Sequence, residues 1–459
     1  MTSRKLMGTR LGAFAIVFAL GCTGWGCGSS SSDTAVEEQD PAPSETPPEP
    51  PGKDDSAVAQ GYTIAGPRAW MLIGNDLTQG HDTLELTVTP PSTVKYIDMW
   101  IDGAKGTRLK RDGSVFRASA SVASLAAGDH QVLLASNGRK TAFARLEFRR
   151  SHPVYVFVSN DWDDPNNPDS TLARQEQLHE QHPELKITHF VGPYTFTDPK
   201  VTAERAEYLA TWVKGLRDKY GDEIGLHIHP WCSFVDQTSV KCRTEPSFAY
   251  AEGDTTGYTV VLASYTKQEM LILLGRAKEI FAQHGLGTPT GFRAGGWTTE
   301  IPTLQALAES GFVADGSPAN WSRMEEWKDV AGSSLYSWCQ EHWTVINDTT
   351  QPYYPSESDM QESTPPVVPI LEVPDNGLLV DYVTGDEMIE VFGKNWDGGA
   401  ATTPRMVSIG YHPPNFGENF KTRINTALTH IDKYLATQDT GPVVYARISD
   451  LPKVWKPAN

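Results

Sequence analysis

The sequence predicts an α/β protein whose larger part is a distorted parallel β/α barrel, preceded by a small all-β sandwich. Two observations predict this fold class. From His152 onward, short apolar runs of strand character alternate with helical segments, which is typical of a parallel sheet flanked by helices. Before His152, short alternating runs are separated by turn signals, which favours an Ig-like sandwich. The chain has 459 residues, enough for two or three domains.

The first 27 residues have the pattern of an export signal. Three basic residues precede the apolar stretch 11–20, which is too short to span a bilayer as a helix, and Gly21 and Cys22 follow it. Bacterial lipoprotein signals end in the same manner, with the cysteine lipidated. We therefore expect a lipid anchor on Cys22 that holds the protein at the cell envelope. Ordinary cleavage and secretion is the alternative.

Residues 28–60 are rich in proline, serine and acidic residues and contain almost no large apolar side chains. Such a composition buries too little surface to fold, so a disordered tether is expected here. The whole chain carries a formal net charge of -18. This acidic balance argues against nucleic acid as a partner.

Residues 61–151 are expected to form the Ig-like sandwich. The runs 83–89 and 94–101 alternate apolar and polar residues, and Asp102-Gly103 is a turn signal between strands. No group of residues in this segment suggests catalytic chemistry.

Residues 152–459 are expected to form the barrel, in which strands and helices alternate. The predicted strands lie within 154–158, 186–191, 223–231, 290–293, 312–315, 368–373, 406–411 and 443–446. The predicted helices are a segment capped by Ser170, the segment 202–220 ended by Gly221, a segment opened by the capping box Thr266–Glu269 and closed by Gly285, and 302–310. The polar segment 345–365 is expected to be a long loop.

Six polar residues lie at or just past the carboxyl ends of these predicted strands. In parallel β/α barrels, active sites are built on that face. Any one of the six could be an ordinary buried polar residue, but their shared position predicts a site. They are Asp161, His227, His229, Arg293, Asp315 and His412.

The histidine pair predicts a divalent-metal site. His227 and His229 are two residues apart on a strand, so both imidazoles face the same side. The Asp-Trp-Asp-Asp segment 161–164 ends a different strand and can supply the oxygen ligand that two histidines lack. Two histidines and one carboxylate are a common ligand set for Zn²⁺ and similar ions.

These residues resemble the motifs of the polysaccharide deacetylases of the NodB, or carbohydrate esterase four, type. The resemblance covers about residues 152–450 and implies a barrel of the NodB type. In that family an aspartate pair ends the first strand, and here the segment 161–164 holds that place. A pair of metal-binding histidines follows, matched by His227 and His229.

Three later motifs extend the resemblance. The family has an arginine in a turn with an aromatic residue, matched by Arg293 in Arg-Ala-Gly-Gly-Trp297. It has an acidic and aromatic stretch, which resembles Asp315 to Trp321. Its final motif is a histidine at a strand end, matched by His412 in Gly-Tyr-His-Pro-Pro-Asn.

Two features depart from the main family pattern. The two histidines are two residues apart rather than four, as in a divergent branch with His-x-His-Pro-Trp and Phe-Arg-Ala-Gly patterns. The first motif also leaves the base and metal ligand open as Asp161 and Asp163, or as Asp163 and Asp164. The first pairing is favoured because residues i and i+2 share a face on an extended chain.

The resemblance implies a metal-dependent hydrolase that removes acetyl groups from a glycan. Asp163 and the two histidines would hold a divalent ion, Zn²⁺ by expectation, that activates water. Asp161, held by Arg293, would be the base. His412, oriented by Asp315, would protonate the leaving group.

Three tryptophans near the expected site, Trp231, Trp297 and Trp321, are candidate platforms for sugar rings; ordinary packing is the alternative for each. A catalytically inactive carbohydrate-binding lipoprotein on the same fold is the alternative function, suggested by the altered histidine spacing. A structural envelope protein is a third hypothesis.

Cys232 and Cys242 are ten residues apart in one loop just after the histidine pair. Exported proteins can oxidise such a pair, so a disulfide is expected between them. Cys339 would then have no disulfide partner.

Overall fold

The structure is a computed structural model that describes residues 58–457. The expected signal segment 1–27, its Cys22 and almost all of the expected tether 28–60 lie outside the described residues. Within 58–457, no helix combines the length and apolar character that crossing a membrane requires.

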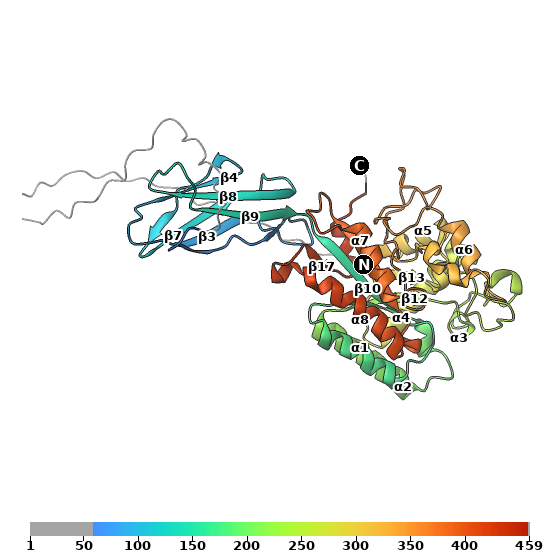
Figure 1. The fold of residues 1–459 in the computed structure, drawn as a ribbon. Coiled ribbons are helices and arrows are strands. Elements are labelled where there is room, and N and C mark those ends of the chain that lie inside the picture. Colours follow the sequence, from blue (N-terminus) through green and yellow to red (C-terminus); the bar gives the residue numbers. More distant parts are fainter. Residues whose placement is uncertain (1–57, 458–459) are drawn as a thin grey trace, which may run out of the picture. The chain divides into compact units, whose positions relative to one another are not determined.

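Residues 63–151 form two β-sheets around a common apolar core (Figure 1). Along β3 the side chains of Leu84, Leu86 and Val88 point inward and are buried, while their neighbours are more exposed. The Ig-like classification stays a prediction. In sheet order, one sheet contains β1 (Thr63–Ala65), β3 (Thr83–Thr89), β7 (Val115–Ser121) and β6 (Lys110–Asp112); the other contains β2 (Trp70–Leu72), β9 (Ala144–Ser151), β8 (Gly128–Ser136), β4 (Ile97–Ile101) and β5 (Ala104–Lys105).

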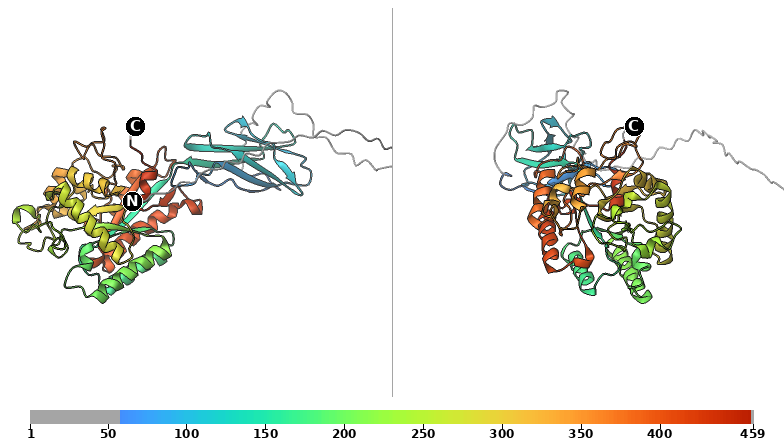
Figure 2. Two further views of the ribbon diagram at one scale, coloured as in Figure 1. Left: turned by 180° about the vertical axis from the view of Figure 1, so that it is seen from behind. Right: turned by 90° about the vertical axis from the view of Figure 1, so that its right-hand side faces the viewer.

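Residues 154–445 contain an eight-stranded parallel sheet flanked by helices (Figures 1 and 2). The order is β15-β14-β13-β12-β11-β10-β16, with β17 paired to the first half of β10. Its strands are β10 (Val154–Asp161), β11 (Ile187–Val191), β12 (Glu223–Ile228), β13 (Gly291–Ala294), β14 (Ala314–Asp315), β15 (Leu371–Glu372), β16 (Arg405–Tyr411) and β17 (Val443–Tyr445). This α/β architecture with a curled parallel sheet agrees with the predicted fold class.

The chain that follows β15 pairs with the opposite edge of the sheet. Leu379 forms a parallel bridge to Gly410 on β16, and the backbone N–H of Val380 donates to the carbonyl of Gly410 at 2.9 Å. This pairing links the two edge strands and brings the segment 378–382 beside the carboxyl end of β16.

The helices agree in part with the sequence prediction. The capping box of Thr266 and Glu269 is confirmed at the start of α4. The first helix is capped at Pro168 and not at Ser170, and α7, opened by a second capping box at Thr384, was not predicted. The α-helices are α1 (Asp169–Gln181), α2 (Ala203–Tyr220), α3 (Cys232–Val235), α4 (Lys267–Gln283), α5 (Ile301–Glu309), α6 (Leu335–His342), α7 (Gly385–Asn395) and α8 (Glu418–Ile431).

Short 3₁₀ helices complete the connections. They are η1 (Pro193–Phe196), η2 (Pro246–Phe248), η3 (Leu262–Ser264), η4 (Gly295–Trp297), η5 (Trp321–Trp327), η6 (Pro413–Asn415), η7 (Asp432–Tyr434), η8 (Ala436–Gln438) and η9 (Ile448–Lys453). Between Ile346 and Ile370 the structure has no helix and no strand, only isolated bridges, as expected for the long loop.

Candidate metal centre

Three side chains from two strand ends converge on one point. Asp163 follows β10, His227 belongs to β12, and His229 follows it. The Nε2 atoms of His227 and His229 lie 3.1 and 3.3 Å from the same carboxylate oxygen, Oδ1 of Asp163. One ligand atom from each residue can be chosen so that all three lie within 4.8 Å of one another. These are the three residues that the sequence predicted as metal ligands, and the structure brings them together.

The protonation of the two imidazoles fits a metal ion. Nδ1 of His227 donates to the carbonyl of Arg293 at 2.9 Å, and Nδ1 of His229 donates to the carbonyl of Tyr258 at 2.7 Å. Because a carbonyl can only accept, each ring carries a proton on Nδ1, and in its neutral form it presents a lone pair at Nε2. Those lone pairs face a carboxylate oxygen, an arrangement that is repulsive without a cation between them.

The spacing and burial support the same conclusion. Nε2 of His229 is buried and has no hydrogen-bond partner, which is costly unless a ligand satisfies it. Ligands about 2.0–2.2 Å from a tetrahedral ion lie roughly 3.3–3.6 Å apart, close to the 3.1 and 3.3 Å observed. The residues therefore fit a divalent ion such as Zn²⁺.

The backbone near the site is shaped to admit the histidines. A Cβ atom at Gly295 would lie 2.4 Å from Nδ1 of His229, so only glycine leaves room for that ring. The next residue, Gly296, has φ +60°, a conformation that favours glycine. Gly295 thus leaves room for the His229 ring at the candidate metal centre.

Asp161, at the end of β10, is held by Arg293. The guanidinium Nη1 lies 3.1 and 3.2 Å from the two carboxylate oxygens of Asp161, and Nη2 lies 3.3 Å from Asp375. All three side chains are almost completely buried. Burial works against the charged guanidinium, but the two carboxylates outweigh it and raise the pKa of Arg293. Asp161 also lines the cavity, as expected for a base.

His412 lies on the other side of Asp163, with its Nε2 3.5 Å from Oδ2 of that residue. Its Nδ1 forms an ion pair with Oδ2 of Asp381 at 2.9 Å. Burial alone would lower the pKa of His412, but the charges of Asp163 and Asp381 overcome this and raise it to about 10. The imidazole therefore holds a proton beside the cavity.

The predicted role of Asp315 is wrong. Asp315 does not contact His412; its carboxylate accepts hydrogen bonds from the hydroxyl and backbone N–H of Ser317 and packs against Glu372. Burial raises the pKa of both carboxyl groups, since neither is solvated. Asp381, which sequence reasoning missed, orients His412 instead. Its signal was the apolar run Leu378-Leu-Val380 directly before it, which resembles the other strand ends.

The charge balance at Asp163 supports a ligand role. Burial would raise the pKa of Asp163, but the charge of the His412 imidazolium opposes this, and the pKa lies well below its ordinary value, so Asp163 is a carboxylate. Asp164 behaves differently, because burial and the charge of Asp163 raise its pKa. Asp164 is not among the ligating atoms, so the geometry favours the pairing of Asp161 and Asp163.

The site opens into a cavity of about 310 Å³. Aromatic rings and carboxylates line it together. The lining residues include Asp161, Asp163, Asp164, His227, His229, Tyr258, Trp297, Trp327, Asp381, Tyr382 and His412.

Of the three predicted tryptophan platforms, only Trp297 lines the cavity, and it is 3% exposed. Trp231 packs against Tyr258 and donates its indole N–H to the backbone carbonyl of Asp163 at 3.2 Å. Trp321 packs against Tyr336 outside the cavity lining. Both predictions are therefore corrected, because packing against Tyr258 and Tyr336 holds these partly buried rings outside the cavity lining.

Trp327, which sequence reasoning did not single out, lines the cavity and is 37% exposed. Its ring lies 5.0 Å from that of Tyr382, which in turn lies 5.5 Å from that of Trp297. These three rings form an aromatic wall of the cavity. No periodic pattern marks Trp327, since it ends a short 3₁₀ helix.

The expected disulfide is present in the structure between Cys232 and Cys242. Cys339 is a buried free cysteine. The bond closes the segment that follows His227 and His229.

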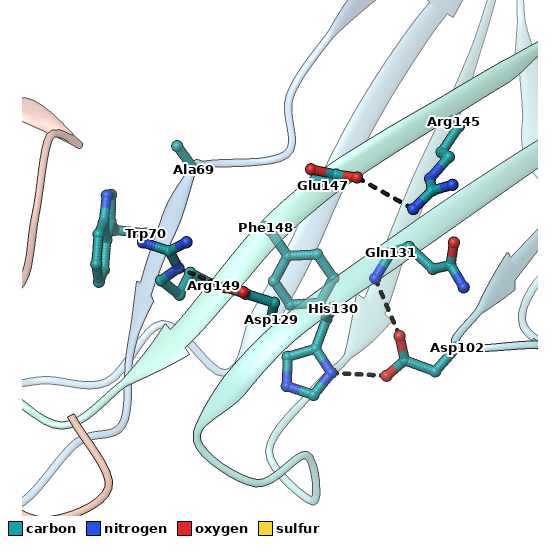
Figure 3. A pocket seen from close by; sticks show the side chains of 10 residues that line it. All are labelled: Ala69, Trp70, Asp102, Asp129, His130, Gln131, Arg145, Glu147, Phe148 and Arg149. Carbon is teal, nitrogen blue, oxygen red and sulfur yellow. Dashed lines mark hydrogen bonds and ion pairs between the residues drawn. The ribbon is translucent and has the colours of Figure 1, made fainter. Parts of the chain in front are cut away.

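A larger hollow of about 550 Å³ lies on the sheet of β8 and β9 (Figure 3). Its charged groups pair with one another: Arg149 with Asp129, Arg145 with Glu147. Its aromatic rings, Trp70 and Phe148, are buried. It offers neither free charges nor exposed rings to a ligand, so the smaller cavity is the candidate functional site.

No family model and no curated protein matches the chain. Among solved structures, a Mycobacterium smegmatis protein assigned as a polysaccharide deacetylase matches at 15% identity and TM-score 0.39, covering 65% of this chain and 88% of that one. A family 4 carbohydrate esterase from Streptomyces lividans, in complex with acetate, matches at 12% identity and TM-score 0.33, covering 66% and 98%. A family 4 acetyl xylan esterase from Clostridium thermocellum matches at 11% identity and TM-score 0.33, covering 65% and 90%. At these identities and TM-scores the likenesses carry no argument about function, which rests on the chain's own site.

Proposed function

We propose that the chain is a metal-dependent hydrolase that removes acetyl groups from an acetylated glycan at the cell envelope. One observation carries this proposal. Two imidazole lone pairs and one carboxylate oxygen face a common point in a cavity that also contains Asp161 and a protonated His412. The motif order in the sequence, which resembles that of polysaccharide deacetylases, supports the same chemistry.

A divalent ion held by Asp163 and the two histidines would supply Lewis acidity at the cavity floor. Asp161, fixed by Arg293, is placed to accept a proton from the attacking water. The water oxygen bonds to the acetyl carbon, and the bond from that carbon to the sugar nitrogen or oxygen breaks. His412, fixed by Asp381, gives its proton to the leaving group, and acetate is released.

The envelope location and the lipid anchor on Cys22 are part of this proposal. They are supported by the residues before the anchor: a basic segment, a short apolar stretch and Gly-Cys. The Ig-like assignment of residues 61–151 and the disordered tether belong to the proposal as well. In this arrangement the tether separates the folded domains from the membrane.

The proposal is tested by acetate release. The zinc-loaded protein is incubated with N-acetylated chitooligosaccharides, peptidoglycan fragments and O-acetylated xylan, and free acetate is measured. We expect release from at least one of the three, abolished by a chelator and restored by added zinc. Zinc-loaded protein that retains a glycan but releases no acetate from the panel would favour the catalytically inactive, carbohydrate-binding alternative.

We predict that Trp327 contributes to glycan binding. An exposed indole at the cavity can stack on a sugar ring, and its loss removes about 1–2 kcal/mol of binding. Trp327→Ala should therefore raise KM for an oligosaccharide by roughly 5–30-fold and leave kcat nearly unchanged. Steady-state kinetics measure both constants.

Trp321→Ala is the matched control, because Trp321 lies in the same 3₁₀ helix but outside the cavity lining. We expect its KM to stay near that of the unaltered protein. If Trp321→Ala raises KM and Trp327→Ala does not, then the platform is Trp321, as the sequence suggested.

A further inference from the structure

We propose that Tyr258 is a positioning residue that fixes two of the three metal ligands, one through its hydroxyl and one through its backbone carbonyl. The inference rests on the metal centre of the proposed function and adds to it how the chain holds that centre. Tyr258 lies in the loop between η2 and η3, far in sequence from Asp163 and outside every motif identified in the sequence.

The hydroxyl of Tyr258 controls the orientation of the Asp163 carboxylate. It donates a hydrogen bond to Oδ2 at 2.9 Å, whereas Oδ1 faces the two imidazoles. A phenolic hydroxyl is protonated at neutral pH and a carboxylate can only accept, so the hydroxyl is the donor in this bond. The carboxylate is thereby held with one oxygen toward the metal position and the other against the tyrosine.

The backbone carbonyl of Tyr258 controls the second ligand. It accepts the Nδ1 proton of His229 at 2.7 Å, which leaves the Nε2 lone pair directed at the metal position. The tyrosine ring also lies against the imidazole, with ring centroids 4.4 Å apart. Trp231 packs against Tyr258 at 5.0 Å. His229 therefore has little freedom to rotate.

The loop that carries Tyr258 is built to hold this position. The carboxylate of Asp254 accepts four hydrogen bonds, from the backbone N–H and hydroxyl of both Thr256 and Thr259, at 2.7–2.8 Å. Burial opposes the charge on Asp254, but these donors lower its pKa below the ordinary value. The charged carboxylate thus fixes the backbone on both sides of Tyr258, at Thr256 and at Thr259.

The same loop is attached to the segment that follows the histidines. The backbone N–H of Cys232 donates to the carbonyl of Thr256 at 2.7 Å. Gly257 has φ +86°, and a Cβ there would lie 2.4 Å from the carbonyl oxygen of Pro230 and 3.1 Å from Sγ of Cys242. The loop therefore packs directly against the disulfide, which limits its motion relative to His229.

The hydroxyl can be tested separately from the carbonyl and the ring. Tyr258→Phe keeps both and removes only the hydrogen bond to Asp163. Loss of such an outer contact typically weakens metal binding by about 10–100-fold. We expect the Kd for Zn²⁺, measured by competition with a chromogenic chelator, to rise by at least about tenfold. The Tm of the metal-free protein should change little.

Tyr445→Phe is the matched control. Tyr445 is also buried and donates its hydroxyl to a carboxylate, Oδ1 of Asp432 at 2.7 Å, but it lies on β17 outside the cavity. We expect its Kd for Zn²⁺ to equal that of the unaltered protein. If the loss of a buried tyrosine hydroxyl destabilises the fold in general, Tyr445→Phe will show the same lowered Tm.

The visible spectrum of the Co²⁺-substituted protein gives a second readout, because its d–d bands report ligand geometry and not stability. Tyr258→Phe should shift these bands, whereas Tyr445→Phe should not. Unchanged zinc affinity and unchanged cobalt bands in Tyr258→Phe would overturn this inference and leave the proposed function intact. An unaltered protein that binds neither ion would overturn the metal centre itself.

Discussion

Asp163→Asn should remove nearly all bound zinc from the purified protein. Oδ1 of Asp163 is the atom that both Nε2 atoms face, at 3.1 and 3.3 Å. An asparagine amide lacks the negative charge that attracts a divalent ion to this position. We expect metal affinity to fall by more than the roughly 10–100-fold that loss of an outer contact costs. Zinc content falls from about one ion per chain toward none in elemental analysis, and acetate release is lost with it.

His229→Ala should give the same result, because it removes a second ligand. Asp164→Asn is the control for the choice of carboxylate. Asp164 lies next to Asp163 and also lines the cavity, but it is not one of the ligating groups. We expect Asp164→Asn to retain its zinc. If Asp164→Asn loses zinc and Asp163→Asn keeps it, the metal ligand has been assigned to the wrong residue.

Arg293→Met should lower the free energy of unfolding by about 3–5 kcal/mol. Arg293 is fully buried and is the cation between two buried carboxylates, Asp161 at 3.1 Å and Asp375 at 3.3 Å. Removal of the guanidinium leaves both carboxylates without a counter-charge and the carbonyl of Gly316 without its donor at 2.8 Å. Urea denaturation of the metal-free protein measures the difference.

Arg276→Met is the control for the loss of an arginine ion pair. Arg276 pairs with Glu279 on the surface of α4, where such a pair contributes at most about 1 kcal/mol. A second comparison adds Asp161→Asn and Asp375→Asn to Arg293→Met, which removes the uncompensated charges and should recover part of the lost stability. If Arg293→Met and Arg276→Met lower the free energy of unfolding equally, the stabilising role of the buried ion pairs of Arg293 is contradicted.

The sequence was sufficient to predict which residues meet at the candidate metal centre because two simple rules determine their position. Side chains two residues apart on a strand share a face, which aligns His227 with His229. Parallel strands end at the same edge of a sheet, which brings Asp163 to them. Neither rule depends on loop conformation, so the sequence places the two histidines beside the segment 161–164, although the choice between Asp163 and Asp164 stays open at that level.

The partner of His412 could not be predicted in the same manner. Asp315 follows the same strand-end pattern, but β14 is only two residues long, and its carboxylate is directed to Ser317 and Glu372. Asp381 reaches His412 because the chain after β15 bridges to β16 at Gly410. That bridge joins distant segments, and no local periodicity reveals it.

Loop and aromatic positions were the least predictable. Tyr258 reaches Asp163 only because hydrogen bonds to Asp254 and packing against the disulfide set the loop conformation. For the tryptophans, the sequence shows which ones follow a strand end, but it does not predict which rings are exposed to the cavity. Trp231 and Trp327 therefore differ in exposure for reasons of tertiary packing alone.

The convergence of Asp163, His227 and His229 on one ion is tested most directly by anomalous diffraction at the zinc edge from crystals of the zinc-loaded protein. We expect one peak per chain, about 2.0–2.2 Å from Nε2 of each histidine and from Oδ1 of Asp163. A peak bound by other residues, or no peak in this cavity while zinc is bound elsewhere, would contradict the metal centre and the hydrolysis proposed from it.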